Sequence, residues 1–579
     1  MRALRLALAQ VNMTVGDLDG NTAKVLEYIG RAKGLGVDII AFPELAITGY
    51  PPEDLLLKPS FIAENIRRLE RIVEQSKGIG VIVGFVDAGE DLYNAAAVIW
   101  DGELLRIYHK MYLPTYGVFD EDRYFQAGNE SPVFALGDVV VGVNVCEDMW
   151  YPGGPIAAQA AAGAQVLVNI NGSPYHAGKR AFRERMLATR ASDELVVIAY
   201  VNMVGGQDEL VFDGGSVIID QQGNLVARGS QFEEDLVVAD LELESVFRTR
   251  LHDPRRRKER RRWEEAGVPA TVQRPALPSR PKPPLPARAP TIYEPPGSAA
   301  EVYTALVLGT RDYVRKNSFK QVLIGLSGGI DSSLTATIAV DALGAENVFG
   351  VAMPSRFSAD ASTEDAVELA ANLGISLRTI SIEPAFRAML EMLSEPFRGT
   401  PFGIAEENVQ ARIRGMILMA LSNKLGYLVL TTGNKSELAT GYSTLYGDMA
   451  GGFNALKDVL KTKVYELAHY RNARGPGSPI PGRVLEREPT AELRPDQRDV
   501  DTLPPYPLLD DVLRAYVEED RSFEAMVAMG FEEGLVKRVV EMVDRSEYKR
   551  RQAPPGIKIT VRAFGRDRRL PISNRYRQW

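Results

Sequence analysis

The amino-acid sequence predicts an α/β protein of two domains joined by a linker, and three observations indicate this organisation. Up to about residue 245, short apolar runs alternate with helical stretches. Ten of the 28 residues from 269 to 296 are proline, which favours an extended, semi-rigid spacer. From 300 onward, strands alternate with helices of ten or more residues, a pattern typical of a parallel, doubly wound sheet. We therefore expect domains at 1–245 and 300–579, with a basic and proline-rich linker at 246–299.

The composition is that of an ordinary globular protein, with 45% apolar and 25% charged residues. The net charge of −8 argues against general nucleic-acid affinity, and no run approaches the roughly 18 apolar residues of a membrane helix. The first 13 residues are interpreted as a strand and not as a signal peptide, because Gln10 interrupts a short apolar core. A single cysteine excludes an intrachain disulfide, and four scattered histidines give no zinc-ligand spacing. We expect a cytoplasmic protein.

Eight short runs predict the strands of the first domain. They are rich in Val and Ile and are bounded by Gly, Asp or Pro, as is typical of buried strands. The runs cover residues 4–12, 37–44, 80–88, 94–100, 139–148, 164–172, 195–205 and 214–220.

The only cysteine, Cys146, lies at the end of one of these runs and directly precedes two acidic residues. A free thiol has a pKa near 8.5 and is mostly protonated at neutral pH, so a nucleophilic cysteine needs a base or a cation nearby. A side chain at a strand end is expected to emerge at the sheet edge instead of the core, which suits a nucleophile. The alternative is structural, because free cysteine is often buried and simply fills space.

Two other strand ends carry partners for such a thiol. Glu44 follows an apolar run and a proline, and Lys110 follows another run. Each of these residues, taken alone, is typical of a solvated surface group. A base, a cation and a thiol at three strand ends form a set that is far less ordinary.

The segments "FPEL", "YHKMYLP" and "NVCEDMW" in this first domain resemble the motifs of the nitrilase, or carbon-nitrogen hydrolase, superfamily. The resemblance covers nearly all of 1–245 and implies a four-layer α-β-β-α sandwich. It also implies that Cys146 is the nucleophile, Glu44 the general base and Lys110 the cation that stabilises the oxyanion. These roles agree with thiol attack on an amide through a thioester.

Superfamily members that feed a synthetase use glutamine, and the resemblance implies a set of glutamine-binding positions here. By their offsets from the motifs, these are Tyr50, Tyr116, Phe119, Glu121, Ser173 and Lys179. Either Lys179 or Arg180 is expected to meet the substrate carboxylate. We interpret His109 and His176 as structural or positioning residues, because the set already contains a base.

The second domain opens with a strand, a loop of small residues and a helix in "VLIGLSGGIDSSLTA". Helices are expected at 299–317, 333–344 and 363–374, and strands at 321–326, 347–353 and 377–382. Gly328 and Gly329 let backbone N–H groups approach an anion at the helix start, so phosphate is the natural guest. The loop matches neither the Walker pattern nor the dinucleotide fingerprint, and a purely structural turn is the alternative.

The loop resembles the pyrophosphate loop of ATP pyrophosphatases, which transfer AMP from ATP to a carboxylate or similar oxygen. The matching residues are Ser327, Gly328, Gly329, Asp331 and Ser332, with Ser333 beside them. The resemblance implies ATP as a substrate, and the acid suits Mg²⁺ coordination.

Downstream segments, including "EENVQARIRG", "TTGNKSELATGYSTLYGDMAGGFNALKDVLKTKVYELA" and "EYKRRQAPPG", resemble the glutamine-dependent NAD synthetase family across essentially all of 300–579. The resemblance implies that Met353 borders adenine, Thr432 contacts ATP, Glu437 joins Asp331 on Mg²⁺, and Asp448 and Lys463 lie at the adenylate. Further implied substrate contacts are Asn408, Arg412 and Lys549. Without the resemblance, 435–442 reads as an amphipathic surface segment with a solvated Glu437, and 457–468 as a helix with lysines on its polar face.

The resemblance implies one overall reaction. Glutamine is hydrolysed at Cys146, and the ammonia attacks the adenylated carboxylate of nicotinic acid adenine dinucleotide, giving NAD, AMP and pyrophosphate. It also implies an internal ammonia passage and a homo-oligomer built on a dimer of synthetase domains, for which an octamer is one possible assembly. No membrane or nucleic-acid partner is expected.

Two other functions stay open from the residues alone. An amidotransferase that makes asparagine or a guanine nucleotide would keep both chemistries and change the acceptor, whereas a scaffold with degenerate sites would keep neither. The basic run 255–262 is interpreted as a solvated helix face, with a regulatory or nucleic-acid-binding patch as the alternative.

Overall fold

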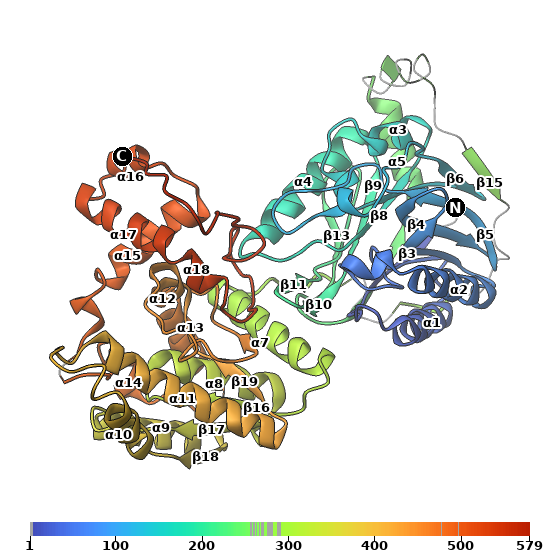
Figure 1. The fold of residues 1–579 in the computed structure, drawn as a ribbon. Helices are drawn as coiled ribbons and strands as arrows, with labels where there is room; N and C mark the ends of the chain where they lie inside the picture. Colours follow the sequence, from blue (N-terminus) through green and yellow to red (C-terminus); the bar gives the residue numbers. More distant parts are fainter. Residues whose placement is uncertain are drawn as a thin grey trace. The chain divides into compact units, whose positions relative to one another are not determined.

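The computed structural model describes residues 4–254, 257–258, 261, 263, 265, 267, 271–274, 282–285, 291–475, 477–495 and 497–579. It divides into two compact units, one of Met1–Gln207 and Val211–Pro295, the other of Asp208–Leu210 and Pro296–Trp579 (Figure 1). Most of the basic run 255–262 and much of the predicted linker lie outside the described residues. Among the described residues, no helix is both long enough and apolar enough to cross a membrane.

The first unit contains a six-stranded sheet in which β1, β2 and β3 run parallel and the outer strands run antiparallel to their neighbours. In spatial order, its strands are β14 (Asp235–Leu241), β1 (Leu4–Gln10), β2 (Ile39–Ala41), β3 (Gly80–Ala88), β4 (Leu92–Trp100) and β5 (Glu103–His109). Strands β1 to β3 are almost entirely buried, which explains their continuous apolar sequence.

A second sheet has seven strands, and its central strands β7, β8 and β9 are parallel. In spatial order, these are β13 (Leu225–Arg228), β12 (Val217–Ile219), β9 (Val197–Asn202), β8 (Val166–Asn171), β7 (Val139–Val145), β6 (Val133–Leu136) and β15 (Thr271–Arg274). A separate hairpin pairs β10 (Val204–Gln207) with β11 (Leu210–Asp213). All eight strands predicted for the first domain are present.

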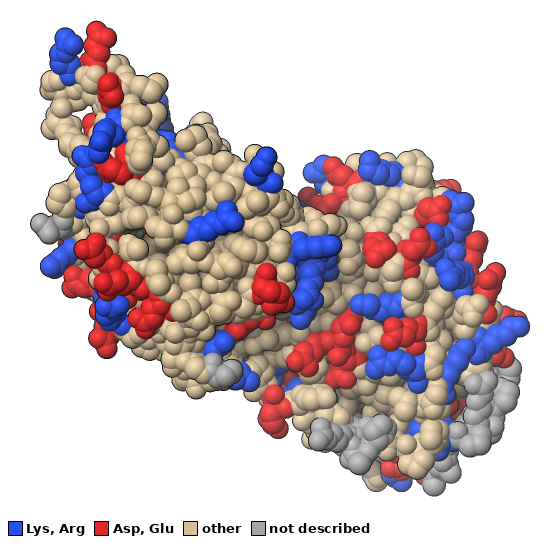
Figure 2. Space-filling model, turned by 90° about the horizontal axis from the view of Figure 1, so that it is seen from below, with Lys and Arg blue, Asp and Glu red and all other residues tan. Residues whose placement is uncertain are grey.

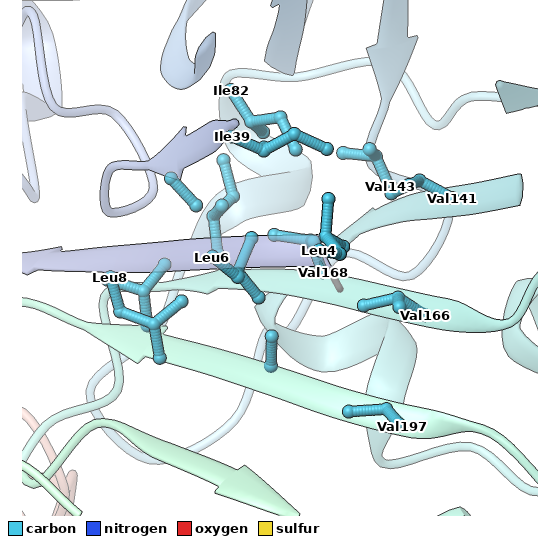
Figure 3. Packing of buried hydrophobic residues seen from close by; sticks show 14 of the residues in the cluster. Leu4, Leu6, Leu8, Ile39, Ile82, Val141, Val143, Val166, Val168 and Val197 are labelled. Carbon is cyan, nitrogen blue, oxygen red and sulfur yellow. The ribbon is translucent and has the colours of Figure 1, made fainter. Parts of the chain in front are cut away.

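The two sheets pack face to face through one apolar core. Figure 3 shows Leu4, Leu6 and Leu8 of β1 beside Val166 and Val168 of β8 in this core. Each such fully buried aliphatic side chain contributes on the order of 2 kcal/mol.

Helices cover the outer faces of both sheets. On the first sheet these are α1 (Leu18–Gly34) and α2 (Pro59–Gln75), and Asn65 of α2 donates to the carbonyl of Val86 in β3 (Figure 1). On the second sheet, α3 (Pro155–Ala161) and α4 (Lys179–Glu194) pack on an apolar cluster, and α5 (Leu243–His252) follows β14. The predicted α-β-β-α sandwich is therefore confirmed.

The second unit is built on a five-stranded, wholly parallel sheet. Its spatial order is β18 (Ser376–Thr379), β17 (Val348–Ala352), β16 (Val322–Gly325), β19 (Leu428–Thr431) and β20 (Phe453–Asn454). The chain leaves from one side of β16 and returns on the other, which creates a topological switch point at the carboxyl ends of β16 and β19. Open α/β sheets bind ligands at such a point.

Helices flank this sheet, as predicted for a doubly wound fold. On one side, α10 (Glu383–Met392) and α11 (Ile404–Leu425) pack on side chains of β16, β17 and β19. Helices α7 (Ser298–Lys316), α8 (Ile330–Leu343) and α13 (Lys461–Ala473) pack together beside β16, with α9 (Asp360–Leu373) next to α8. The strand predicted at 377–382 ends at Thr379, because Ile382 already has helical backbone angles as the N-cap of α10.

A helical cluster at the C-terminal end of this unit was not predicted from the sequence. Its core joins α12 (Lys435–Thr440) to α15 (Tyr506–Leu513), α16 (Phe523–Ala528) and α17 (Glu533–Arg545). The remaining short helices are α14 (Gly482–Glu486) and α18 (Glu547–Arg550). The packing matters for the site because α12 carries Glu437.

Candidate functional site

The first unit brings together three residues that end separate strand segments. Lys110 directly follows β5, Cys146 directly follows β7, and Glu44 lies three residues beyond β2. Lys110 Nζ lies 2.7 Å from Glu44 Oε1, and both side chains are fully buried. The charges of both groups act on the pKa of the Cys146 thiol. The predicted set of thiol, carboxylate and ammonium is therefore assembled in one place.

The expected position of the Cys146 side chain needs correction, because the thiol is buried in the core between the two sheets. The reason lies in the backbone. Cys146 has a φ of 44° and begins a 3-10 turn over Cys146–Met149, so the chain turns sharply where β7 ends. The nucleophile candidate thus lies at the end of a strand and inside the sandwich at the same time.

Burial sets the protonation of this group of residues. Burial and the Glu44 carboxylate raise the pKa of the Cys146 thiol well above its usual value, although Lys110 opposes the shift. For Lys110, burial lowers the pKa, but Glu121 and Glu44 outweigh it and the pKa is raised. The resting thiol is therefore neutral, and the charged groups that act on it are the Lys110 ammonium and the Glu44 carboxylate.

Glu121, predicted as a glutamine contact, lies in the same buried group. Its carboxylate accepts from Tyr50 Oη at 2.9 Å and lies 2.8 Å from Lys110 Nζ. Burial raises the pKa of Glu121 to about 7, against the lowering effect of Lys110. Two carboxylates thus share one ammonium, and Glu121 titrates near neutral pH.

Asn94, which was not predicted from the sequence, joins the two carboxylates. Its amide donates to Glu44 Oε1 at 2.7 Å and to Glu121 Oε2 at 3.2 Å. The backbone N–H of Gly172 donates to the other oxygen of Glu44 at 2.8 Å. A polar amide at the start of the apolar run 94–100 was the available sequence signal.

The other predicted glutamine-binding residues include an exposed aromatic side chain. Tyr116 is 58% exposed, donates to both oxygens of Glu147 at 3.0 Å, and contacts Phe119 edge to face. Ser173 is buried, and its backbone N–H donates to Asn202. This arrangement places an exposed aromatic side chain next to the buried Glu147 carboxylate.

The contacts of Lys179 and Arg180 differ, and Lys179 Nζ donates to the carbonyl of Pro174 at 2.6 Å. Lys179 lowers the pKa of Glu147, which burial otherwise raises, so the two groups are close enough to interact. Arg180 instead pairs with Glu184 at 2.9 Å on its own helix.

Both histidines point to other partners. His109 lies 2.7 Å from Asp87 and stacks on Tyr93 with ring centroids 4.0 Å apart. The half-buried His176 contacts the carbonyl of the next residue. These contacts agree with structural or positioning roles.

The second unit contains a cavity of about 300 Å³ at the carboxyl ends of β16, β17 and β19. Nine predicted residues line it: Ser327, Gly328, Gly329, Asp331, Ser332, Met353, Thr432, Glu437 and Asp448. Ser333, at the start of α8, donates to the carbonyl of Gly329 at 2.8 Å and so holds the loop. The loop and the strand ends therefore form one concave site.

Gly328 is required by this loop. Its φ is 77°, and a Cβ at this position would lie 2.1 Å from the carbonyl oxygen of Ser362. Only glycine can adopt this conformation at this distance without displacing a neighbour.

The cavity holds a compact group of charges. Lys461 forms an ion pair with Asp331 and lies 3.5 Å from Glu437, while Asn434 donates to Asp331 at 2.9 Å. Burial and the Asp331 charge raise the pKa of Glu437 to about 8. Two close carboxylates are hard oxygen donors of the kind that Mg²⁺ prefers. Among the described residues, no group of three or more metal-ligand side chains was found.

The prediction for Lys463 is not supported by its position. Lys463 pairs with Glu466 at 2.8 Å, whereas Lys461, two residues earlier, lines the cavity. Helix α13 begins at Lys461, and two helical residues differ by about 200° around the axis, so the two side chains leave opposite faces. The helical phase, which was not used in the sequence analysis, distinguishes them.

The remaining predicted substrate contacts converge on the segment 441–448. Lys549 donates to the carbonyls of Gly441 and Ser443, and Arg412 donates to the carbonyl of Leu445. Asn408 accepts from Thr444 Oγ1 at 2.7 Å, and Asp448 accepts from the N–H of Thr444. Asn408, Arg412 and Lys549 thus support the segment that leads to the cavity-lining Asp448.

The segment 435–442 is not a surface segment, as its pattern alone had indicated. Lys435 is buried and pairs with Asp458 and Glu518 at 2.7 Å, and Ser436 donates to Asp510. Tertiary packing against the C-terminal helical cluster overrides the amphipathic pattern here.

Comparisons with known proteins agree with this geometry. Family models for carbon-nitrogen hydrolase and for NAD synthase match residues 5–251 and 302–553, respectively. The fold and the two sites thus define a carbon-nitrogen hydrolase fused to an NAD synthase.

Relatives match over the whole chain. Glutamine-dependent NAD(+) synthetases of Thermotoga maritima and Aquifex aeolicus are each 49% identical to it and cover 100% and 99% of this chain and 100% of their own length. The structure of the Acinetobacter baumannii glutamine-dependent NAD+ synthetase, solved with adenosine diphosphate, is 41% identical, covers 99% of both chains and has a TM-score of 0.73. The chain belongs to the glutamine-dependent NAD(+) synthetase family.

Proposed function

We propose that this protein is a ligase that makes NAD from nicotinic acid adenine dinucleotide, ATP and L-glutamine. One observation carries the proposal: the same chain presents a buried Cys-Glu-Lys group in one unit and a phosphate loop beside two carboxylates in the other. The membership of the chain in a family named for this reaction supports it. We assign the glutaminase to residues 1–245, the linker to 246–299 and the synthetase to 300–579, in a cytoplasmic protein.

In the proposed glutaminase step, Glu44 accepts the proton of the Cys146 thiol as sulfur attacks the side-chain amide carbon of glutamine. Lys110 stabilises the negative charge that develops on the amide oxygen. Collapse of the tetrahedral intermediate returns the proton from Glu44 to nitrogen, and ammonia leaves. Water, activated by the same carboxylate, then hydrolyses the thioester to glutamate and restores the thiol.

Tyr50, Tyr116, Phe119, Glu121, Ser173 and Lys179 are proposed to bind glutamine. The substrate carries an ammonium and a carboxylate besides its amide, so its site needs groups of both signs. Glu147 and Lys179 supply such a pair, and Tyr116 donates to Glu147. These residues hold the amide carbon near sulfur and take no part in bond breaking.

In the proposed synthetase step, an oxygen of the substrate carboxylate attacks the α-phosphorus of ATP, and the bond to pyrophosphate breaks. Ammonia then attacks the carboxyl carbon of the acyl adenylate, loses a proton, and AMP leaves with the original oxygen. The loop of Ser327, Gly328, Gly329, Ser332 and Ser333 offers backbone N–H and hydroxyl groups to the phosphates. Lys461, which lies in the cavity, offers positive charge to the departing pyrophosphate.

Other cavity residues are proposed to bind the nucleotide and the dinucleotide. Met353 and Thr432 line the cavity on the side of β17 and β19 and are assigned to ATP, while Asp448 is assigned to the dinucleotide. Asp331 and Glu437 fit a divalent cation, because they are neighbouring carboxylates, and burial together with the Asp331 charge raises the pKa of Glu437. Mg²⁺ held there would offset negative charge on the ATP phosphates.

The two steps need a connection, because free ammonia is mostly protonated near neutral pH and ammonium cannot attack an acyl adenylate. We propose an internal passage that delivers ammonia from one unit to the other.

A homo-oligomer is also proposed, with a second copy of this chain covering an apolar face of the second unit. Helices α10 and α11 and the segment between them expose apolar side chains that the unit itself does not cover. These are Met389, Met392, Phe402, Ile404, Met416 and Met419. Exposed apolar patches of this kind mark protein interfaces. Figure 2, a view from below, shows Lys and Arg side chains and Asp and Glu side chains scattered among broad areas of other residues.

The substrate assignment is tested by AMP release from ATP with glutamine as nitrogen donor and a panel of acceptors. The panel contains nicotinic acid adenine dinucleotide, aspartate and xanthosine monophosphate. AMP release only with the dinucleotide supports the proposal. Release only with aspartate or the purine nucleotide would assign the chain to another amidotransferase, and no release with any acceptor would refute a synthetase.

A further inference from the structure

The turn that carries Cys146 needs a specific support. Cys146 has a φ of 44°, a left-handed conformation that is uncommon for a residue with a side chain and persists only where neighbouring contacts hold it. Asp148, two residues later, makes such a contact within the turn. Its Oδ2 accepts from the backbone N–H of Val145, the last residue of β7, at 3.0 Å.

The same carboxylate also binds the chain segment that carries Lys110. Oδ1 of Asp148 accepts from the backbone N–H groups of Met111 at 3.1 Å and Tyr112 at 3.0 Å. Oδ2 accepts from Tyr108 Oη at 2.7 Å. The donors therefore lie on both sides of Lys110 along the chain.

Asp148 is fully buried, with no exposed surface, and accepts four hydrogen bonds. Hydrogen bonds to an ionised carboxylate are shorter and roughly twice as strong as neutral ones. Burial raises the pKa of Asp148 to about 6, while the hydrogen bonds from Val145 and Tyr108 lower it. The group is therefore ionised above neutral pH and joins the segments 108–112 and 145–149 by charge-assisted bonds.

The neighbouring acid points elsewhere. Glu147 accepts from the exposed Tyr116, which is proposed to bind glutamine. Asp148 has no exposed surface and is saturated by protein donors, so it offers nothing to a substrate.

We propose that Asp148 is a positioning residue of the glutaminase reaction: it sets the separation of Cys146 from Lys110 by joining the two backbones, without touching glutamine. The inference rests on the proposed function in one respect, the role of Cys146 as nucleophile. A misplacement of about 1 Å at reacting groups costs on the order of 100-fold in rate. Loss of the hydrogen bonds of Asp148 should therefore reduce turnover and leave glutamine binding largely intact.

The test compares three variants of the full-length protein. Asp148→Asn keeps the size of the side chain. Each oxygen of Asp148 now accepts from two donors, so the NH₂ group that replaces one oxygen would face two donors instead of accepting from them. Tyr108→Phe removes one of the four hydrogen bonds and leaves the carboxylate in place. Asp138→Asn, at an exposed turn between β6 and β7, is the matched control.

Two readouts separate positioning from general damage. One is kcat and KM for glutamine-driven NAD synthesis, beside the rate with ammonium chloride. The other is the rate at which iodoacetamide alkylates Cys146, the only cysteine of the chain. For Asp148→Asn we expect a fall of about 30-fold or more in glutamine-driven kcat, with KM within about threefold and the ammonium-driven rate within about twofold. Alkylation should slow at least about fivefold, because the thiol is displaced from Lys110.

Tyr108→Phe should give the same pattern at about 3- to 10-fold, and Asp138→Asn should match the unaltered protein. The proposal is overturned if Asp148→Asn keeps glutamine-driven kcat and the alkylation rate within twofold, or if only KM changes. If Asp148→Asn does not fold, the same two readouts on Tyr108→Phe decide. If the proposed function itself is wrong, the unaltered protein will make no NAD from glutamine. The alkylation rate alone then tests whether Asp148 positions Cys146.

Discussion

Lys110 Nζ and Glu44 Oε1 lie 2.7 Å apart with both side chains fully buried. The desolvation cost of such a pair is large, so a buried ion pair is weak evidence of a stabilising role. Its geometry is better explained by chemistry, because it holds a proton acceptor and a cation at a fixed distance beside the Cys146 thiol. Loss of one partner leaves the other charge buried without its nearest counter-charge.

Glu44→Gln tests this account of the pair. The substitution keeps the size of the side chain but removes the proton acceptor, so glutamine-driven synthesis should fall by about 100- to 10,000-fold. Initial rates with glutamine and with ammonium chloride provide the measurement. The ammonium-driven rate should stay within about twofold, because the second unit does not use Glu44.

The matched control for this substitution is Glu90→Gln, at an exposed turn between β3 and β4. It should leave both rates unchanged. An equal loss of glutamine- and ammonium-driven rates in Glu44→Gln would contradict the assignment of Glu44 to the glutaminase.

The raised pKa of Glu121 predicts a pH-dependent stability of the first unit. Its pKa rises from 4.5 to about 7 on folding, so the folded protein holds this proton more tightly than the unfolded chain. The stabilising contribution is full below pH 4.5 and is lost as the pH rises through about 7. As the pH rises from 5 to 8, the unaltered protein should therefore lose on the order of 3 kcal/mol in free energy of unfolding relative to Glu121→Gln.

Hydrogen exchange of peptides from β4, corrected for the intrinsic effect of pH, measures this difference in the first unit alone. A gap between variant and unaltered protein that stays constant from pH 5 to pH 8 would show that Glu121 does not titrate in this range.

Lys461 and Lys463 form a matched pair for testing the second site. Lys461→Ala removes the cation that contacts Asp331 in the cavity and leaves two close carboxylates unpaired. We expect NAD synthesis to fall at least about 100-fold with either nitrogen source. Lys463→Ala, on the opposite face of α13, should keep both rates within about twofold. A larger loss for Lys463→Ala than for Lys461→Ala would restore the assignment made from the sequence.

Gly328→Ala should distort the phosphate loop. The added methyl group would lie 2.1 Å from the carbonyl of Ser362 and would need a φ of 77°. We expect a loss of about 1–3 kcal/mol in stability and a raised KM for ATP, measured by thermal unfolding and by initial rates. Gly329→Ala is the comparison, because its nearest neighbour would be Ser327 Oγ at 3.3 Å, and it should lose less stability. Equal losses would argue against the steric explanation.

The features of the fold that depend on local sequence pattern could be predicted from the sequence. Eight strands of the first unit were visible as short Val- and Ile-rich runs, and the loop after β16 was visible through its spacing of small residues. Other strands of the sandwich, such as β6, β13 and β14, were not predicted. Glu44, Lys110 and Cys146 were identifiable because all three follow such runs, and strand ends gather at sheet edges. The overall fold classes follow from the same alternation of strands and helices.

Contacts between distant segments were not predictable in this way. Asn94 looks like one polar residue at the start of an apolar strand, and only the fold brings it to Glu44 and Glu121. The choice of Lys461 over Lys463 depends on where α13 begins, and helix boundaries are uncertain by one or two residues. Burial of 435–442 depends on the helical cluster around α15 and α17, which lies some 70 residues or more along the chain.

The transfer of amide nitrogen provides the most direct test of the central claim. The protein is supplied with ATP, Mg²⁺, nicotinic acid adenine dinucleotide and glutamine labelled with ¹⁵N at the side-chain amide, and the product is analysed by mass spectrometry. The account predicts ¹⁵N in the carboxamide of NAD, no labelled product with Cys146→Ala, and normal synthesis by that variant from ammonium chloride. Labelled NAD formed by Cys146→Ala at the rate of the unaltered protein would contradict it.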